Sequence, residues 1–288
     1  MLLGADFGHK AGMRLFIGIT GTELTDATRQ LITDVQPMGV VLFARNIRSA
    51  EQVRELNAEL HRLGVIIAVD QENHRVNRLR DFVTLPTIAE VKTSGDATGF
   101  GQRVGATLRE LGFDLDFAPV VDLDYGAKDN ALQERCWGST PAEVVKWAGG
   151  FIDGLQAEGV AACLKHFPGL GRATLDSHES LPIIREPNLA DDLRPFEELI
   201  PRCRYVMIGH GQYPALESVP ASLSRTIITG ILREKLGFRG TVLTDDLEMK
   251  AIRRIGEAAK QAIAAGADAV LVCHDPAKIR EAHAALSG

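Results

Sequence analysis

The chain has 288 residues, of which 45% are hydrophobic and 24% charged, and its formal net charge is -6. These values are ordinary for a globular protein, and the negative charge argues against a polyanion as its main partner. No lysine and arginine block resembles a nucleic-acid footprint, and no apolar run approaches the roughly 20 residues of a membrane-spanning helix. We therefore expect neither nucleic acid nor a membrane among its partners.

The first residues contain an early acid and lack the basic and apolar regions of a secretory signal. We expect residues 1–12 to form a disordered extension, with Met13 as an alternative start, and the protein to be cytoplasmic. The cysteines are scattered without a C-x-x-C pair, which is typical of reduced thiols and indicates neither a disulfide framework nor a zinc cluster. We predict no metal and no cofactor.

Apolar, β-branched runs alternate with amphipathic segments along the chain. Strands are predicted at residues 14–20, 39–44, 65–70, 115–119, 159–167, 205–210, 240–246 and 269–273. Helices are predicted at residues 25–35, 50–63, 99–111, 141–157, 226–236 and 256–265. Such alternation indicates parallel strands, and eight βα units is the number that closes a barrel. We predict an α/β fold, a single TIM-type (β/α)8 barrel over residues 13–288; an open doubly wound sheet is the alternative.

Polar residues recur where the predicted strands end. These ends carry Asp70-Gln71-Glu72, Lys165-His166, His210, Thr244-Asp245-Asp246 and His274-Asp275. In a barrel the carboxyl ends of all strands meet at the face that holds the active site. The sequence therefore predicts that these residues converge there.

Two kinds of chemistry fit this set. Asp245 and Asp246 are candidates to attack an anomeric carbon, and alternation along a strand lets only one of them face the centre. Hydrolysis of a sugar also needs a proton donor, which His178 supplies if Asp176, two residues earlier, orients its ring and favours its charged form.

A second set combines two cations, an imidazole and a carboxylate, which suits a site that grips several hydroxyl groups. Its members are Lys165, Arg135, His166 and Asp70. The loop of Arg135 follows the fourth predicted strand and so belongs to the same face. An alternative is a barrel enzyme in which Lys165 forms a Schiff base.

At these residues the chain resembles family 3 glycoside hydrolases, specifically the bacterial single-domain β-N-acetylglucosaminidases of cell-wall recycling. The likeness runs from about Phe16 to Ala284 and rests on several long motifs in order. They include Lys165-His166-Phe167-Pro168-Gly169, Asp176-Ser177-His178, Val69-Asp70-Gln71-Glu72, Phe117-Ala118-Pro119-Val120 and Thr244-Asp245-Asp246-Leu247-Glu248-Met249.

The resemblance implies a role for each matching residue. Asp245 matches the nucleophile that forms a glycosyl-enzyme intermediate, and Asp176 with His178 matches the dyad that acts as general acid and then base. The residues matching those that hold the terminal N-acetylglucosamine are Asp70, Arg135, Lys165 and His166.

The resemblance thus implies a retaining β-N-acetylglucosaminidase acting on a small carbohydrate from cell-wall (muropeptide) fragments, and we expect a monomer. The sequence departs from the family pattern at Asn73, His74, Gln133, Cys136 and Leu170. Three alternatives stay open: another sugar specificity, transfer to phosphate, or a sugar-binding relative with weakened catalysis.

Overall fold

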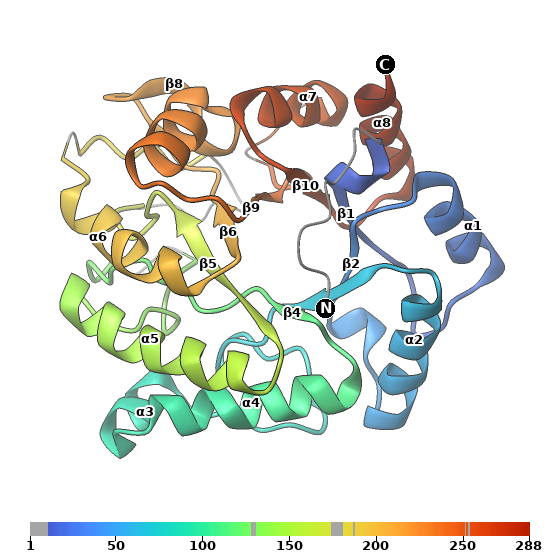
Figure 1. Ribbon diagram of the computed structural model, residues 1–288, viewed down its shortest axis with the longest axis horizontal. Helices are drawn as coiled ribbons and strands as arrows, with labels where there is room; N and C mark the ends of the chain where they lie inside the picture. Colours follow the sequence, from blue (N-terminus) through green and yellow to red (C-terminus); the bar gives the residue numbers. More distant parts are fainter. Residues whose placement is uncertain (1–10, 128–130, 174–180, 187, 251, 253) are drawn as a thin grey trace.

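The computed structural model describes residues 11–127, 131–173, 181–186, 188–250, 252 and 254–288. Its parallel strands form a closed barrel in the order β1-β10-β9-β6-β5-β4-β3-β2 (Figure 1). Closure confirms the predicted (β/α)8 barrel and excludes the open sheet. The predicted extension lies outside the described residues except for Ala11 and Gly12, and so do Asp176 and His178.

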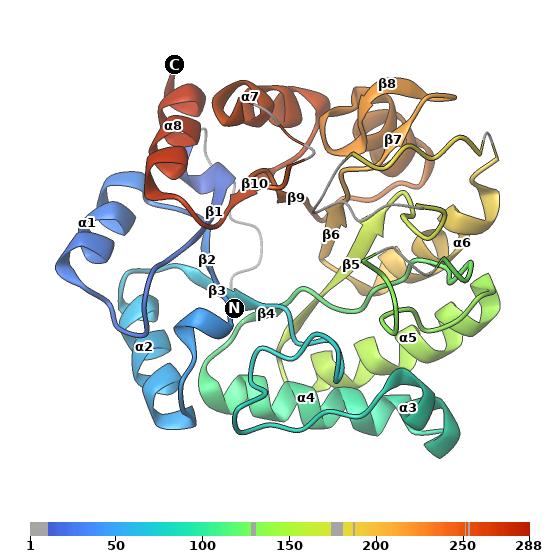
Figure 2. The same ribbon diagram turned by 180° about the vertical axis from the view of Figure 1, so that it is seen from behind.

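Each predicted strand is present, shortened at one or both ends. The barrel strands are β1 (Leu15–Gly18), β2 (Gly39–Leu42), β3 (Ile66–Val69), β4 (Leu115–Asp116), β5 (Ala161–Phe167), β6 (Tyr205–Ile208), β9 (Thr241–Asp246) and β10 (Ala269–Val272). Two further short strands, β7 (Gln212–Tyr213) and β8 (Glu217–Pro220), form an antiparallel pair outside the barrel (Figure 2).

Helices surround the barrel. They are α1 (Asp26–Val35), α2 (Ala50–Arg62), α3 (Ile88–Ser94), α4 (Ala97–Leu111), α5 (Pro141–Ala157), α6 (Ala190–Leu199), α7 (Ile255–Ala265) and α8 (Pro276–Ser287), with η5 (Thr226–Lys235) a π-helix. Single 3₁₀ turns occur at η1 (Ala11–Arg14), η2 (Ala44–Asn46), η3 (Ile200–Arg202) and η4 (Ala221–Leu223). All six predicted helices are confirmed, whereas α3, α6 and α8 were not among them.

Hydroxyl caps fix where two of these helices begin. The Ser49 hydroxyl accepts a hydrogen bond from the Gln52 N–H (3.2 Å), and the Thr140 hydroxyl accepts one from the Glu143 N–H (3.3 Å). Pro141 occupies the first turn of α5, where its missing N–H costs nothing. Since each helix follows a loop at the carboxyl end of a strand, these caps also set the length of the loops around the site.

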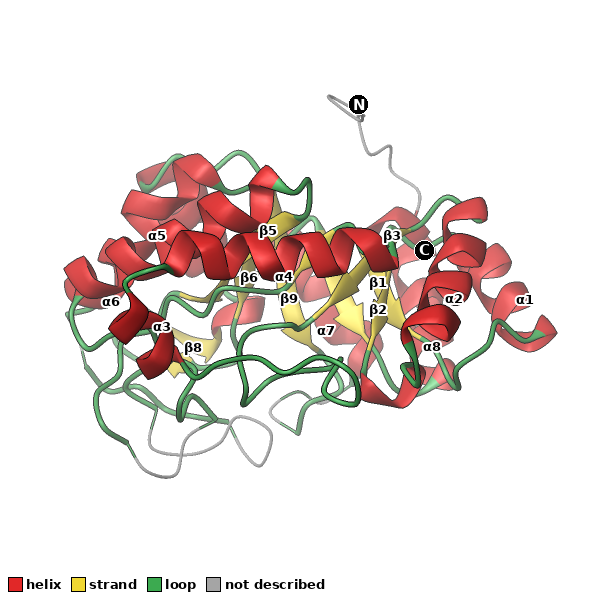
Figure 3. Ribbon diagram, turned by 90° about the horizontal axis from the view of Figure 1, so that it is seen from below, coloured by secondary structure: helices red, strands yellow, loops and turns green. Residues whose placement is uncertain are grey.

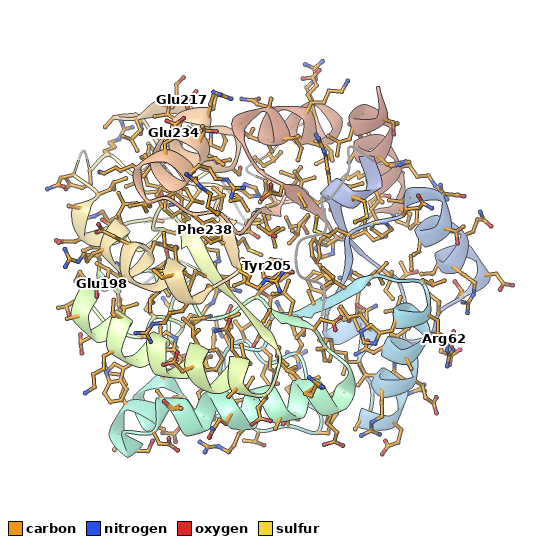
Figure 4. The ribbon with its side chains drawn as sticks, in the orientation of Figure 1. Arg62, Glu198, Tyr205, Glu217, Glu234 and Phe238 are labelled. Atoms are coloured by element: carbon orange, nitrogen blue, oxygen red, sulfur yellow. The ribbon has the colours of Figure 1, made fainter. Side chains whose placement is uncertain are left out.

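Alternation along the strands creates two apolar layers. Every barrel strand contributes to the inner layer, whose members are Phe16, Met38, Val41, Ala68, Leu115, Phe117, Cys163, Met207, Leu243, Ala269, Leu271 and Cys273. Tyr205, at the start of β6, packs against this layer and points toward the middle of the barrel, while Arg62 of α2 lies at the periphery (Figure 4). Long loops gather on one side of the molecule, in the lower part of the view in Figure 3. The inner layer fills the barrel interior, so we look for a site among the loops at the carboxyl ends of the strands.

Candidate active site

A cavity of about 380 Å³ opens among the loops at the carboxyl ends of the strands. Its lining includes five of the predicted site residues: Asp70, Arg135, Lys165, His166 and Asp245. They come from the ends of β3, β5 and β9 and from the loop after β4. The predicted convergence is confirmed for these residues and for Glu72, Asp246 and His274, whereas the lining does not include Gln71, His210, Thr244 or Asp275. The structure does not describe Asp176 and His178, whose placement stays a prediction.

Lys165 is the centre of a buried ion cluster. Its side chain is 2% exposed, and its Nζ lies 2.7 Å from Asp70 Oδ1 and 2.6 Å from Glu72 Oε1. Burial alone lowers the pKa of the Lys165 ammonium, but the Asp70 and Glu72 carboxylates outweigh it and the net pKa is raised. A lysine that forms a Schiff base needs a neutral amine. The geometry therefore argues against Schiff-base chemistry at Lys165.

Arg135 joins the same cluster through a bidentate pair. Its Nε and Nη2 donate to Glu72 Oε2 (2.8 Å) and Oε1 (2.7 Å), and its Nη1 donates to the carbonyl of Ala131 (2.9 Å). Burial raises the pKa of Glu72, but Arg135 and then Lys165 lower it to about 2. Burial likewise raises the pKa of Asp70, but Lys165 and Arg78 bring it well below its usual range. Both carboxylates are ionised at neutral pH.

These shifts define the pH range in which the cluster stabilises the fold. Asp70 and Glu72 have folded pKa values below their unfolded ones, so their contribution is complete above the unfolded values and is lost as pH falls through the folded ones. Lys165 has a raised pKa, so its contribution is complete below its unfolded value and is lost only at high pH. The cluster therefore keeps its charges from mildly acidic to mildly basic conditions.

His166 is oriented by a buried acid. Its Nδ1 lies 2.7 Å from Asp122 Oδ2, and the other Asp122 oxygen accepts from the Leu170 N–H (2.6 Å). A carboxylate can only accept, so His166 Nδ1 carries the hydrogen and Nε2 is left for other partners. Since His166 also lines the cavity, Asp122 fixes the orientation of an imidazole at the cavity wall.

Both acids of β9 line the cavity, so the prediction that alternation allows only one of them to face it is wrong. The physical reason is a register shift between β9 and β10, where Ala269 pairs with Leu243 but Leu271 pairs with Asp246. Asp245 is half-buried and Asp246 buried. The N–H of Asp246 donates to Asp245 Oδ1 (2.8 Å), which ties the two residues together.

Arg78 and Asp122 were not among the residues predicted at this site, and Glu72 was predicted there only by its place at a strand end, without a role. Glu72 and Arg78 line the cavity, and Arg78 Nη2 lies 3.4 Å from Asp70 Oδ2. Asp122 is not among the lining residues and acts on the site through its contact with His166 Nδ1. Glu72 and Asp122 each follow a strand end in the sequence, which is a usable signal. Arg78 follows Asp70 by eight residues in an irregular loop, and no pattern singles it out.

The departures from the family pattern leave the cluster intact. Neither Asn73 nor His74 has a positive φ, so the glycine-like conformation is not needed there. Instead Asn73 Nδ2 donates to the Glu134 carbonyl (2.9 Å), and its Oδ1 accepts from the Arg75 N–H (2.8 Å). Leu170 is buried against the cavity.

Of the remaining departures, Gln133 is exposed. Cys136 Sγ lies 3.8 Å from the Leu132 carbonyl oxygen, and burial raises the pKa of this thiol, which disfavours the nucleophilic thiolate. Within the described ranges, no three acidic, histidine or cysteine side chains are placed to share a metal ion. None of the helices traced there is both long and apolar enough to span a membrane.

The Glycosyl hydrolase family 3 N terminal domain matches residues 12–287 of this sequence. The chain belongs to glycosyl hydrolase family 3. The β-hexosaminidase of Pseudomonas aeruginosa is 39% identical over 285 residues, with 94% of this chain and 86% of that protein aligned. The β-hexosaminidase of Idiomarina loihiensis is 35% identical over 281 residues, covering 92% and 84%.

Solved structures agree with this family 3 assignment. NagZ from Neisseria gonorrhoeae in complex with N-trifluoroacetyl-D-glucosamine has a TM-score of 0.87 at 33% identity, over 94% of this chain and 84% of that one. A family 3 β-N-acetylglucosaminidase from Paenibacillus has a TM-score of 0.92 at 37% identity, over 97% of this chain. This chain spans 57% of the Paenibacillus protein. The protein is therefore a glycoside hydrolase, and its cavity is the candidate active site of this family 3 barrel.

Proposed function

We propose that this family 3 enzyme is a retaining β-N-acetylglucosaminidase, which removes terminal N-acetylglucosamine from cell-wall (muropeptide) fragments through a covalent glycosyl-enzyme intermediate. The observation that carries the proposal is that the Asp245 carboxylate and a cluster of buried ions line the same cavity. The printed names of its relatives, β-hexosaminidase and β-N-acetylglucosaminidase, support the same sugar.

The ion cluster suits recognition of a sugar. Asp70, Lys165, Arg135 and His166 offer donors and acceptors to the cavity, and each is already held before a ligand enters. Lys165 is paired with Asp70, Arg135 with Glu72 and His166 with Asp122. Charge-assisted hydrogen bonds to hydroxyl groups are strong, and a prearranged site spends little entropy in forming them. We assign these four residues to binding of the terminal sugar.

The reaction then proceeds in two steps. In the first, Asp245 attacks the anomeric carbon, the bond to the leaving oxygen breaks, and His178 gives that oxygen a proton. In the second, His178 takes a proton from water, whose oxygen attacks the same carbon and releases Asp245. Asp176 orients His178 in both steps. Two inversions at one carbon retain its configuration.

The organisation of the chain follows from the barrel. We infer one catalytic domain over residues 13–288, because the closed barrel and its helices lie within that range. The monomeric state and the cytoplasmic location stay predictions.

The test of reaction and sugar together is turnover of an aryl N-acetyl-β-glucosaminide compared with an aryl β-glucoside, each with and without phosphate. We expect hydrolysis of the first substrate, little of the second, and free N-acetylglucosamine as the product in both buffers. A β-configured initial product in the NMR spectrum would support retention. Formation of a sugar phosphate would show phosphorolysis. A preference for the aryl β-glucoside would show that the enzyme acts on a different sugar, and binding without turnover would indicate a sugar-binding relative with weakened catalysis.

His178→Ala tests the proton donor. A good leaving group needs little protonation, so the variant should lose much more activity on a poorly activated aryl glycoside than on a well activated one. The contrast should reach about 100-fold, within the usual range for general acid catalysis. Asp176→Ala should show the same pattern more mildly, because its role is orientation. Equal losses on both substrates, with an unaltered pH profile, would remove the dyad from the mechanism.

A further inference from the structure

The mouth of the cavity can be told from its deep end by the exposure of the side chains that line it. Of the lining residues that the structure describes, Arg75 and His274 are exposed, and the others are buried or half-buried. The side chain of Lys165, at the centre of the ion cluster, is only 2% exposed. Arg75 and His274 therefore mark the mouth, and the ion cluster lies deeper. His274 is engaged there, because its ring nitrogens lie 3.1 Å from Arg45 Nη1 and 3.0 Å from Asp246 Oδ2.

Arg75 differs from the other cations of the lining in its lack of an acidic partner within the described ranges. The other cations are each paired with a carboxylate of the ion cluster: Lys165, Arg135 and Arg78. No acid in that part of the chain forms an ion pair with Arg75. Glu134, on the neighbouring loop, lies 3.5 Å from His74 instead and does not line the cavity. The Arg75 guanidinium is thus open to an anion that enters from outside.

The backbone of Arg75 is held in a tight turn after β3. The Glu72 N–H donates to the Val76 carbonyl (2.9 Å), and the Arg75 N–H donates to Asn73 Oδ1 (2.8 Å). Asn73 Nδ2 donates to the Glu134 carbonyl (2.9 Å), which ties this turn to the loop after β4. Asn73 is one of the departures from the family pattern. In this chain its side chain fixes the base from which Arg75 reaches the cavity.

We propose that Arg75 binds a carboxylate on the leaving group and so makes the enzyme selective for β-N-acetylglucosaminides with an acidic aglycone; this rests on the proposed function. In the proposed reaction the terminal sugar lies beside the buried ion cluster, so the part of the substrate at the mouth is the aglycone. A guanidinium group presents its N–H donors in a fork that fits the two oxygens of a carboxylate. One cation also neutralises one carboxylate, whereas a phosphate dianion would keep a negative charge.

The test uses two substrates that differ only in the charge of the aglycone. They are carboxymethylphenyl N-acetyl-β-glucosaminide and its primary amide, each as the meta and the para isomer. The methylene group keeps the acidity of the two phenols similar, so the ratio of their kcat/KM values reports recognition of the charge. We expect the wild type to prefer the acid by about fivefold in at least one isomer, as for an exposed ion pair of good geometry. Added salt should reduce this preference.

Substitutions of Arg75 should change that ratio. Arg75→Gln should bring it to about one, mainly through a higher KM for the acid, because a contact with a remote group acts in the ground state and the transition state alike. Arg75→Lys keeps the charge without the fork and should retain part of the preference. Arg75→Glu should reverse it. Arg75 is exposed, so the melting temperature should change little in these variants.

Arg80 provides a matched control. It is exposed, it lies in the same loop after β3, and it is not among the lining residues. Arg80→Gln changes the net charge of the protein by the same amount as Arg75→Gln and should keep the wild-type ratio. An equal fall of the ratio in both variants would show that overall charge, and not a site at Arg75, causes the preference.

The outcomes separate this inference from the proposed function. If the wild type hydrolyses neither substrate, the proposed function is refuted. If it hydrolyses both equally well, or if Arg75→Gln leaves the ratio unchanged, only this inference is refuted. An equal loss on the acid and the amide in Arg75→Gln would place Arg75 at the terminal sugar and would also overturn its role toward the aglycone.

Discussion

Asp245→Asn should reduce hydrolysis of an activated aryl N-acetylglucosaminide by at least about a thousandfold, because an amide cannot form the glycosyl ester. The loss should be the same for good and poor leaving groups, since in both cases the leaving oxygen departs in the step in which Asp245 attacks. The fold should be unchanged, because an asparagine oxygen can still accept from the Asp246 N–H, which lies 2.8 Å from Asp245 Oδ1. Phenol release and the melting temperature measure the two outcomes.

Asp246→Asn is the comparison for that experiment, since both acids line the cavity and only chemistry distinguishes them. It keeps an oxygen acceptor for the Glu248 N–H (3.0 Å), so it should retain far more activity than Asp245→Asn. A reversed ranking would assign the nucleophile to Asp246.

Lys165→Met should have the second largest effect, on stability as well as on activity. The substitution leaves the carboxylates of Asp70 and Glu72 buried without the cation that lies between them, a change that typically costs about 3–5 kcal/mol. Arg135 and Arg78 still offset part of this charge. Sugar binding should weaken together with turnover, because these interactions act in the ground state and strengthen in the transition state.

Chemical denaturation at several pH values tests the stability effect. The difference between wild type and Lys165→Met should narrow as pH falls, because the pair is lost in the wild type when Asp70 and Glu72 take up protons. Lys146→Met, on the exposed face of α5 over Trp147, is the control and should change neither stability nor kinetics much.

Arg135→Ala should weaken binding and turnover through the loss of its bidentate pair with Glu72. If both Lys165→Met and Arg135→Ala keep wild-type kinetics, the assignment of the sugar-binding site to this cluster is wrong.

The barrel and the position of its site were predictable from local pattern. Each strand is a short apolar run, five of the eight predicted strands end in polar residues, and parallel closure brings those ends together whatever the loops do. Asp70, Lys165 and Asp245 could therefore be assigned to one site from their place in the chain.

The partners of those residues were not predictable, because each depends on distances across the fold. Asp122 reaches His166 over 44 residues of sequence, and Arg135 reaches Glu72 over 63. The register shift in β9 has no sequence signature here, yet it places Asp246 beside Asp245 on the cavity. Alternation is a rule for regular strands, and it failed where the strand is irregular.

The apolar layer inside the barrel gives the cavity a floor. Val41, Phe117, Met207, Leu271 and Cys273 belong both to that layer and to the cavity lining, so the cavity ends blindly there. In the proposed reaction a sugar chain could not pass through this cavity, which would restrict cleavage to residues at chain ends and require the enzyme to release its substrate after each cleavage. A terminal sugar bound against the floor would leave last, through the opening by which it entered, and would block the next substrate until then.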